Sequence, residues 1–254
     1  MALLDLNRAE ASLSCFNKVI EITPNSESAW FSKGIALTKL GRLKQAEKCY
    51  EKVIEIKPEH DQAWFEKGKI LDTLGRTEEA LQCYDKSISF NRKLGEAWKY
   101  KGNALQALGR TKEAMACYDE AIGVSGDDEE VWNNKGIAAD SAGELSEALR
   151  CFDKAIQLKV GYEPAWFNKG MTQYKMLKHE DAIKSFDRAI EIKPDNEKAW
   201  NKKGESLGEL GRPDEAVKAF ERAIEIRGDF ETAWYNKGLL LDRLKRYDEA
   251  LACY

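Results

Sequence analysis

The sequence lacks long apolar runs and any strong excess of charge of one sign. No run approaches the roughly 18 apolar residues that a membrane-spanning helix needs. The N-terminal segment already carries charge at Asp5 and Arg8, which is too early for the apolar centre of a secretory signal peptide. The net charge of -4 comes from mixed acidic and basic residues, whereas nucleic-acid binding usually requires a basic surface. We therefore expect neither a membrane nor a nucleic acid as partner.

Residues that carry catalysis or bind metals are also scarce. The two histidines, His60 and His179, have no cysteine or second histidine nearby at the spacing of metal ligands. Nucleophile-elbow, HExxH and phosphate-loop motifs are absent from the sequence. The acidic run 127–130 precedes an expected helix start, where the helix dipole favours negative charge, so we interpret it as solvated helix-start charge. The sequence predicts no enzyme activity, no metal site and no cofactor.

What the sequence does contain is a repeat of 34 residues, marked by its seven tryptophans. In every copy a glycine follows the tryptophan by four residues, an alanine by sixteen and an aromatic residue by twenty. The tryptophans are Trp30, Trp64, Trp98, Trp132, Trp166, Trp200 and Trp234. This agreement at four positions indicates that the repeat determines the fold.

Each copy is interpreted as two helices joined by a short turn. The first helix is expected over residues 63–74, and Gly75 then ends it because glycine tolerates the left-handed conformation. The second is expected to begin near Thr77 as its N-cap, and Pro213 takes that place in another copy, as proline does in a first helical turn. Prolines, which cannot continue a helix, close three of the repeats, at Pro24, Pro58 and Pro194.

This pattern closely resembles the tetratricopeptide repeat over the entire chain. The resemblance implies an all-α fold, a right-handed superhelical α-solenoid of antiparallel helix pairs whose first helices line the concave side. Stacking is also required physically, because one helix pair cannot bury both of its apolar faces. Leu177 and Lys245 depart from the family pattern by replacing the turn glycine, and we expect differently shaped turns there.

The phase of the repeats predicts a single solenoid over residues 1–254. Residues 1–26 form a partial repeat, in which Leu6, Cys15 and Phe16 align with repeat positions, and residues 231–254 form another. The full repeats are 27–60, 61–94, 95–128, 129–162, 163–196 and 197–230. Solenoids normally end in polar capping helices. Since neither end carries one, we interpret the chain as a segment of a longer repeat protein; the alternative is self-association through the uncapped ends.

All six cysteines occupy one repeat position, where Ser185 and Ala219 stand in the other copies. Equivalent helices of adjacent repeats lie at least about 8–10 Å apart, beyond the roughly 7 Å between Cα atoms that a disulfide allows. A metal-binding ladder is the alternative, but exchange with serine and alanine indicates a site for a small packed side chain. Reduced thiols are typical of a reducing compartment, so we expect a cytoplasmic protein.

A helical wheel of the first helix places the tryptophan, the glycine and two leucines on one side. Residues one, two and five positions after the tryptophan lie on the other side and vary between copies. The resemblance implies that this side lines the concave groove. The candidate peptide-binding residues are Lys99, Tyr100, Asn103, Asn133, Asn134, Phe167, Asn168, Met171, Asn201, Lys202, Tyr235 and Asn236.

Two kinds of side chain characterise this candidate groove. Asparagine amides donate and accept hydrogen bonds, so a row of them suits the main chain of an extended peptide. Asn134, Asn168 and Asn236 match the asparagine ladder of some family members. Exposed apolar side chains are expected to receive hydrophobic anchors of a partner. These are Phe31, Phe65, Phe167, Met171 and Tyr174. The alternative is an inert, solvated helix face.

The carboxylate clamp, with which some family members grip the acidic tails of chaperones, is matched only in part. Lys99, Asn103 and Asn134 fit its first half. Two cations are then required on the following first helix, where Pro164 and Asn168 stand instead. We do not expect a complete clamp.

A lysine follows every tryptophan by three residues, where the common family pattern has leucine. Because it occurs in every copy, we interpret it as part of the architecture and not as a reactive residue. We expect its methylene stem to cover apolar surface. A contact of its amine with the tryptophan ring, worth about 0.5–1 kcal/mol, is a further hypothesis.

Together these features predict a protein-interaction scaffold that binds a peptide or a segment of a partner protein in its concave groove, without catalysis. Groove charge is mixed, so we predict no preference for an acidic or a basic ligand. The alternative is a structural module that self-assembles through repeat ends or outer faces, as part of a larger protein.

Overall fold

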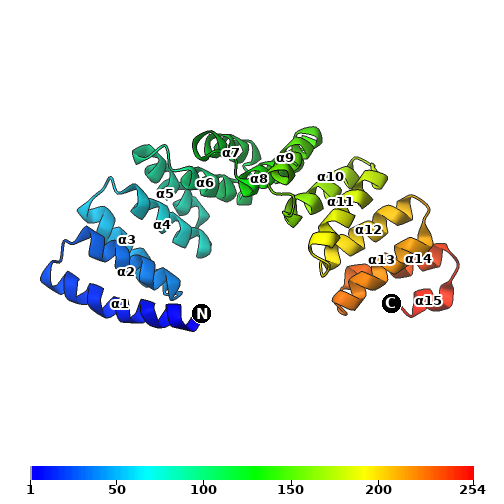
Figure 1. The fold of residues 1–254 in the computed structure, drawn as a ribbon, viewed down its shortest axis with the longest axis horizontal. Coiled ribbons are helices and arrows are strands. Elements are labelled where there is room, and N and C mark those ends of the chain that lie inside the picture. The colour runs from blue at the N-terminus through cyan, green and yellow to red at the C-terminus, as the bar shows by residue number, and fades with distance from the viewer. Residues whose placement is uncertain (1) are drawn as a thin grey trace. The chain divides into compact units, whose positions relative to one another are not determined.

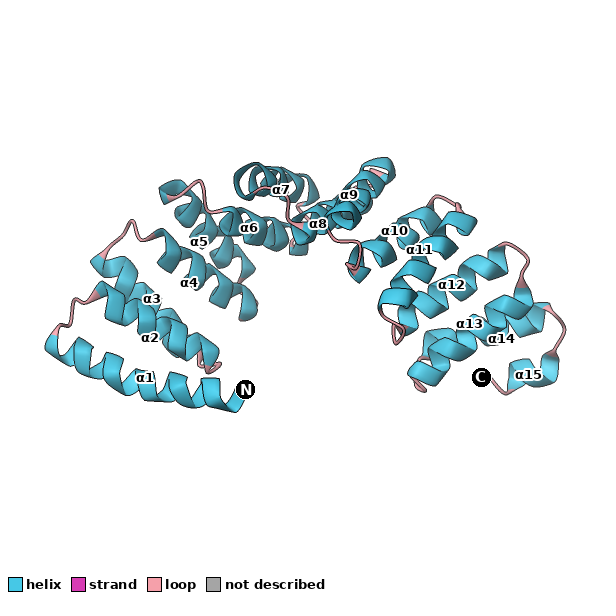
Figure 2. Cartoon of the chain, viewed as in Figure 1, coloured by secondary structure: helices cyan, strands magenta, loops and turns pink. Residues whose placement is uncertain are grey.

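Helices form all the regular structure in the computed structural model, which describes the backbone of residues 2–254 and the side chains of residues 9–254. This part of the chain contains fifteen α-helices and no strand (Figure 1, Figure 2). The helices are α1 (Ala2–Ile22), α2 (Glu27–Lys39), α3 (Leu43–Ile56), α4 (Asp61–Thr73), α5 (Thr77–Phe90), α6 (Gly95–Ala107), α7 (Thr111–Ser125), α8 (Glu129–Ser141), α9 (Leu145–Leu158), α10 (Glu163–Lys175), α11 (His179–Ile192), α12 (Glu197–Glu209), α13 (Pro213–Ile226), α14 (Glu231–Arg243) and α15 (Tyr247–Leu251). The all-helical prediction is confirmed, while the side chain of Leu6 lies outside the described residues.

The helices group into two compact units, Met1–Gly126 and Asp127–Tyr254. In the first unit α2 packs on α3, α4 on α5 and α6 on α7, and within this unit α3 also contacts α4 and α5 contacts α6. The second unit repeats this arrangement from α8 to α15. Helix pairs stack within each unit as the repeat predicts, and the continuity of one solenoid between residues 126 and 127 stays a prediction.

The turn between the two helices of a pair places one residue in the left-handed conformation. Gly75 has a φ of 76°, and the two replacements, Leu177 and Lys245, have values of 59° and 61°. The hydrogen bond that closes the turn is also kept where leucine replaces the glycine: the N–H of Lys178 donates to Gln173 O at 2.9 Å. The expectation of differently shaped turns is therefore wrong. The packed helices on both sides impose the turn on residues for which it costs about 1–2 kcal/mol.

Thr77 is the first residue of α5 and not its N-cap, which corrects the predicted helix start. Arg76 occupies the cap position without a side-chain capping bond. The left-handed turn leads directly into the second helix, and the N–H of Ala80 already donates to Arg76 O. Pro213 begins α13, as predicted. Side-chain caps are found instead on first helices, at Ser26, His60, Asp128 and Asn196.

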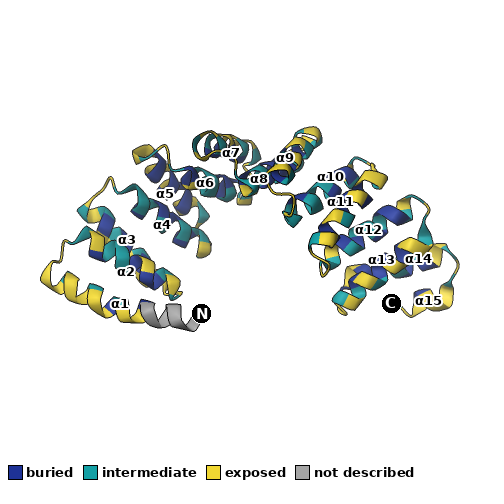
Figure 3. Cartoon of the chain, in the orientation of Figure 1, coloured by how far each residue is buried: buried dark blue, intermediate teal, exposed yellow. Residues whose placement is uncertain are grey.

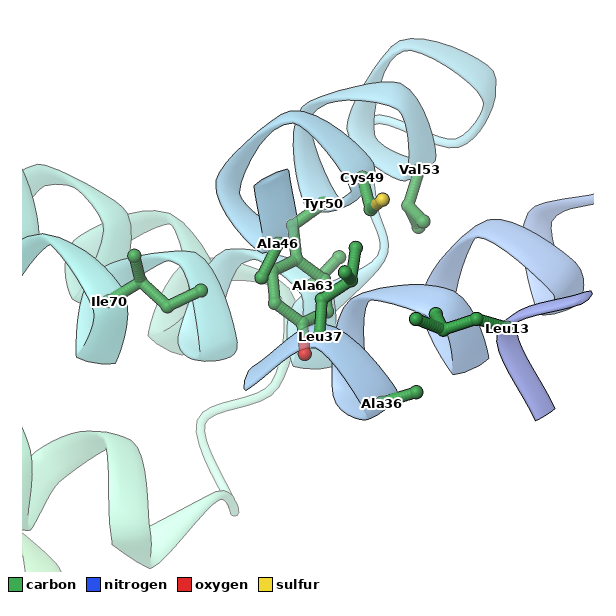
Figure 4. Close-up of a cluster of buried hydrophobic side chains, with 9 residues drawn as sticks. All are labelled: Leu13, Ala36, Leu37, Ala46, Cys49, Tyr50, Val53, Ala63 and Ile70. Atoms are coloured by element: carbon green, nitrogen blue, oxygen red, sulfur yellow. The ribbon is translucent and has the colours of Figure 1, made fainter. Parts of the chain in front are cut away.

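The core of each pair forms where the glycine of the first helix meets the aromatic ring of the second. A Cβ atom on Gly136 would lie 2.5 Å from Cε1 of Phe152, so only glycine permits this contact. Burial follows the facing sides of the helices (Figure 3). One cluster around Tyr50 joins side chains from α1, α2, α3 and α4, including Leu13, Leu37 and Ile70 (Figure 4).

The cysteine position contributes to this core. Cys49, Cys83, Cys117 and Cys151 are buried, and none of the six cysteines, all of which are described, forms a disulfide. Burial raises the pKa of the Cys83 and Cys117 thiols to about 11. These side chains therefore behave as small packed groups, as interpreted, although Cys15 is exposed.

Candidate functional site

Five of the lysines that stand three residues after a tryptophan join adjacent helix pairs through an ion pair. Lys67 Nζ lies 2.9 Å from Glu51 Oε1, on the second helix of the preceding pair. The partner stands sixteen residues earlier, and the same spacing recurs in Lys101–Asp85, Lys169–Asp153, Lys203–Asp187 and Lys237–Glu221. Sequence reasoning missed this role, although the recurring acidic residue at that spacing is a signal for it.

Six of the seven lysines, all except Lys67 among the described contacts, place the amine over the tryptophan ring, which confirms the hypothesised ring contact at those positions. Lys33 Nζ is 5.0 Å from the centroid of Trp30, and Lys203 Nζ is 5.2 Å from that of Trp200. Distances at Lys101, Lys135, Lys169 and Lys237 lie between 5.4 and 5.9 Å. The lysines with an acidic partner hold neighbouring repeats together, so their role is structural.

In the second unit the first helices α8, α10, α12 and α14 are neighbours, because α8 contacts α10, α10 contacts α12 and α12 contacts α14. They share a surface made by the residues two and five positions after each tryptophan. We call it the polar face, and it comprises Asn134, Ile137, Asn168, Met171, Lys202, Glu205, Asn236 and Leu239. All eight residues are half-buried, so each keeps part of its surface exposed to solvent.

Hydrogen bonds between successive first helices orient the asparagines of the polar face. Asn168 Nδ2 donates to Asn133 Oδ1 at 3.0 Å, and Asn236 Nδ2 donates to Asn201 Oδ1 at 3.2 Å. Asn236 Nδ2 also donates to Glu205 Oε1 at 3.1 Å. An amide oxygen has two acceptor sites. Within the described contacts, the oxygens of Asn168 and Asn236 are therefore available to a ligand.

Asn133 and Asn201 are buried, with 4% and 2% of their surface exposed, and they do not line the groove as predicted. The helical wheel assumed that a first helix has one covered side. In the stack it is also covered by the first helix of the next repeat, and the residue directly after the tryptophan faces that neighbour. These two asparagines therefore hold the amides of Asn168 and Asn236 in place through hydrogen bonds.

The apolar residues expected to be exposed are covered for the same reason. Phe65 is 1% exposed, and its ring lies 5.4 Å from that of Tyr100 on the next first helix. Phe167 packs against Phe186 with ring centroids 5.9 Å apart. Phe31, Met171 and Tyr174 are likewise half-buried, whereas Tyr235 on α14 is exposed. A row of exposed apolar anchors is therefore not present on these described helices.

The three predicted residues on α6 belong to the first unit. Asn103 Oδ1 accepts a hydrogen bond from the hydroxyl of Tyr118 at 2.9 Å, and Tyr100 packs edge-on against Phe65. Lys99 Nζ lies 5.9 Å from the ring centroid of Tyr100. These side chains contribute to packing within the first unit, so the polar face gathers only the predicted residues of the second.

Glu205 is the charged centre of the polar face, and its side chain is 18% exposed. Its carboxylate accepts hydrogen bonds from Asn201 Nδ2 and from Lys202 Nζ, both at 2.8 Å, in addition to Asn236. Burial, with the negative charges of Glu205 and Glu209, raises the pKa of Tyr174 nearby. The local charge is therefore largely compensated, and the site presents amides and a neutral phenol.

The histidines have structural positions. His60 Nδ1 caps α4 by accepting from the N–H of Ala63 at 3.1 Å, and His179 begins α11 beside the ring of Tyr174. Among the described residues, no three histidines, cysteines or carboxylates gather to hold a metal ion. No described helix combines the length and the apolar character needed to cross a membrane.

The geometry defines a helical-repeat protein built from stacked 34-residue helix pairs. Family models of the tetratricopeptide repeat match residues 1–26, 28–60, 49–82, 95–138, 129–159, 164–196 and 201–254. The chain belongs to the tetratricopeptide repeat family, which confirms the resemblance inferred from the sequence. Members of the family are generally non-catalytic scaffolds for protein interactions.

Solved structures share this fold. The C-terminal part of a repeat-containing protein from Cytophaga hutchinsonii has 17% identity and a TM-score of 0.74, covering 92% of this chain and 97% of that one. A tetratricopeptide repeat protein from Parabacteroides merdae has 16% identity and a TM-score of 0.72, covering 90% of both. YrrB, described as having an unusual peptide-binding site, has 21% identity and a TM-score of 0.63, covering 75% of this chain and 98% of its own. A search of curated protein sequences finds no match.

Proposed function

We propose that the polar face of the second unit binds an extended segment of a partner protein, without catalysis. The observation that carries this proposal is the support of two surface amides, Asn168 and Asn236, by the buried amides Asn133 and Asn201. A side chain already held in one orientation loses little conformational freedom when a ligand arrives. Its oxygen is then a preorganised acceptor for the main-chain N–H groups of a peptide.

Two further points support this function. The family consists of protein-interaction scaffolds, and one protein of the same fold, YrrB, is described as having a peptide-binding site. In addition, Glu205 is compensated by three donors, so the face does not demand a highly charged ligand. Main-chain recognition through amides is consistent with that balance.

The test is the selection of a random peptide library, displayed on phage, on the whole protein. Enriched peptides are synthesised with a fluorescent label and titrated. The double variant Asn168→Ala/Asn236→Ala removes two hydrogen-bonding groups, each worth about 0.5–1.5 kcal/mol, so we expect affinity to fall about tenfold.

The matched control is Asn17→Ala/Asn25→Ala, which changes two exposed asparagines of the first unit. It is expected to bind the selected peptides like the wild type. Equal affinities of both double variants, or failure to enrich any peptide, would contradict the proposal.

A further inference from the structure

A pocket of about 170 Å³ opens on the polar face, lined by residues of α10, α12, α13 and α14. Phe220 and Leu240 contribute apolar walls, while Glu205 and Asn236 contribute polar groups. Gly208 lines it from α12. The pocket lies entirely within the second unit and includes one of the two oriented asparagines.

The pocket exists because Gly208 lacks a side chain at a position that every other repeat fills. That position, eight residues after the tryptophan, holds Thr38, Asp72, Gln106, Asp140, Tyr174 and Asp242 in the other copies. In the α4–α5 pair Asp72 accepts a hydrogen bond from the hydroxyl of Tyr84 at 2.8 Å. In the α12–α13 pair neither partner of this hydrogen bond is present, because Gly208 stands in place of the aspartate and Phe220, in place of the tyrosine, has no hydroxyl. The space that remains is consequently bordered by an apolar ring.

Packing does not require glycine at this position. A Cβ atom on Gly208 would meet nothing within 4 Å, whereas a Cβ on Gly204 would lie 2.6 Å from the ring of Phe220. Glycine is also among the least favourable residues inside a helix. Gly208 thus keeps a space open at the ligand-facing surface without serving the fold.

We infer that the Gly208 pocket receives one apolar side chain, of leucine or phenylalanine size, from the bound peptide segment. This inference rests on the proposed function and specifies its ligand. The volume of about 170 Å³ is enough for one such side chain, and Phe220, Leu239 and Leu240 offer it apolar contacts.

The charges around the pocket favour a neutral anchor. The carboxylate of Glu205 is already bound by Lys202 and by Asn236. At the mouth, Glu209 and Arg243 carry opposite charges, so neither sign predominates. Asn236 lines the same pocket, and we expect its amide oxygen to accept a hydrogen bond from the main-chain N–H of the residue that enters. Recognition thus combines one apolar anchor with sequence-independent contacts on either side.

The experiment uses the peptides selected on the whole wild-type protein. We expect an apolar residue to recur at one position, and its replacement by alanine to weaken binding by about tenfold or more. Because this measurement uses the wild-type protein, it does not depend on the folding of any variant.

The second arm fills the pocket with Gly208→Leu, which is expected to weaken binding of the same peptides by about tenfold or more. The matched control is Gly123→Leu on α7, another helical glycine whose Cβ would meet nothing within 4 Å. It is expected to bind like the wild type. Gly208→Ala serves as a smaller change if the leucine variant does not fold.

The outcomes separate the two levels of the proposal. Peptides without a recurring apolar residue, or unchanged binding by the folded Gly208 variants, overturn the pocket inference. If Asn168→Ala/Asn236→Ala still weakens those peptides, the proposed function stands. Selection of no peptide, or equal binding by the asparagine double variant, overturns both.

Discussion

The indole Nε1 of Trp132 donates a hydrogen bond to the side-chain Oδ1 of Asp127 at 3.0 Å. The other six tryptophans donate instead to a backbone carbonyl six residues earlier, as Trp64 does to Pro58 O at 2.8 Å. The difference arises where α7 continues to Ser125 and Gly126 then adopts a φ of 80°. Trp132 is therefore the one tryptophan whose indole partner can titrate.

This hydrogen bond predicts a specific response to acid. The bonds from Trp132 and Lys154 hold the pKa of Asp127 below its usual value. The folded state therefore gains stability from the ionised form above the ordinary pKa of about 3.9 and loses it as the pH falls through the lower, folded value. In ¹H–¹⁵N NMR spectra, we expect the indole signal of Trp132 to move with an acidic midpoint while the other six stay in place.

Two variants complete that titration experiment. Trp132→Phe assigns the signal by removing it, and Asp127→Asn keeps an oxygen acceptor but removes the titration. The pH-dependent shift is expected to disappear in Asp127→Asn. A common movement of all seven signals in the folded protein, or persistence of the shift in that variant, would show that Asp127 is not its source.

The lysine bridges predict a measurable coupling between neighbouring repeats. In a double-mutant cycle of Lys203→Met and Asp187→Asn, the free energy of unfolding should show a coupling of about 0.2–1 kcal/mol, because the 2.6 Å ion pair is partly exposed. The coupling should decrease at high salt. Denaturant unfolding provides the measurement.

A second double-mutant cycle, at Lys33, serves as the comparison. Lys33 lies over Trp30, but Asn17 stands where the acidic partner would be. Lys33→Met and Asn17→Ala should therefore show no coupling. Equal coupling in the two cycles would mean that the ion pair does not account for it.

The left-handed residue Leu177 predicts a stabilising substitution. It is 77% exposed and has a φ of 59°, so its side chain contributes little packing while the backbone is strained. Leu177→Gly removes about 1–2 kcal/mol of strain and gives back about 0.4–1 kcal/mol in unfolded-state entropy. We expect a gain of about 0.5–1 kcal/mol in denaturant unfolding. Gly75→Ala should lower the free energy of unfolding. A lower free energy of unfolding in Leu177→Gly would show that the backbone at Leu177 is not strained.

Two glycine-to-alanine variants should have opposite effects. Gly136→Ala places a Cβ 2.5 Å from the ring of Phe152 and is expected to destabilise the protein by about 1–3 kcal/mol through overpacking. Gly123→Ala adds a Cβ in open space within α7 and should stabilise by up to about 1 kcal/mol. Thermal unfolding distinguishes them. Similar shifts in both variants would refute the role of the ring contact.

The repeat pattern alone predicted the helix pairs, the glycine turns between them and most of the core, but not the turns at Leu177 and Lys245. This was possible because the interactions that build a pair are local and occur in every copy: Gly136 against Phe152 is one instance of a contact present at the same spacing elsewhere. The two turn replacements show where local propensity fails. Leu177 and Lys245 adopt the glycine conformation because packing of the adjacent helices outweighs the strain.

The candidate site was predicted less completely. Asn168 and Asn236 lie half-buried on the polar face, whereas Asn133 and Asn201, which the same helical wheel placed in the groove, are buried. A helical wheel describes one helix, whereas these contacts join helices about one repeat apart, from residue 133 to residue 168 and from residue 201 to residue 236.

The sequence by itself determined the period, and with it the family, because each repeat encodes the same glycine, alanine and aromatic contacts. It also contained the lysine and, sixteen residues earlier, its acidic partner, but the spacing alone did not show that the two form an ion pair. Only the tertiary structure decided which side of each first helix remains open and where Gly208 leaves a pocket. The physical reason is that stacking covers a further side of the helix, and this coverage depends on residues of the neighbouring repeat.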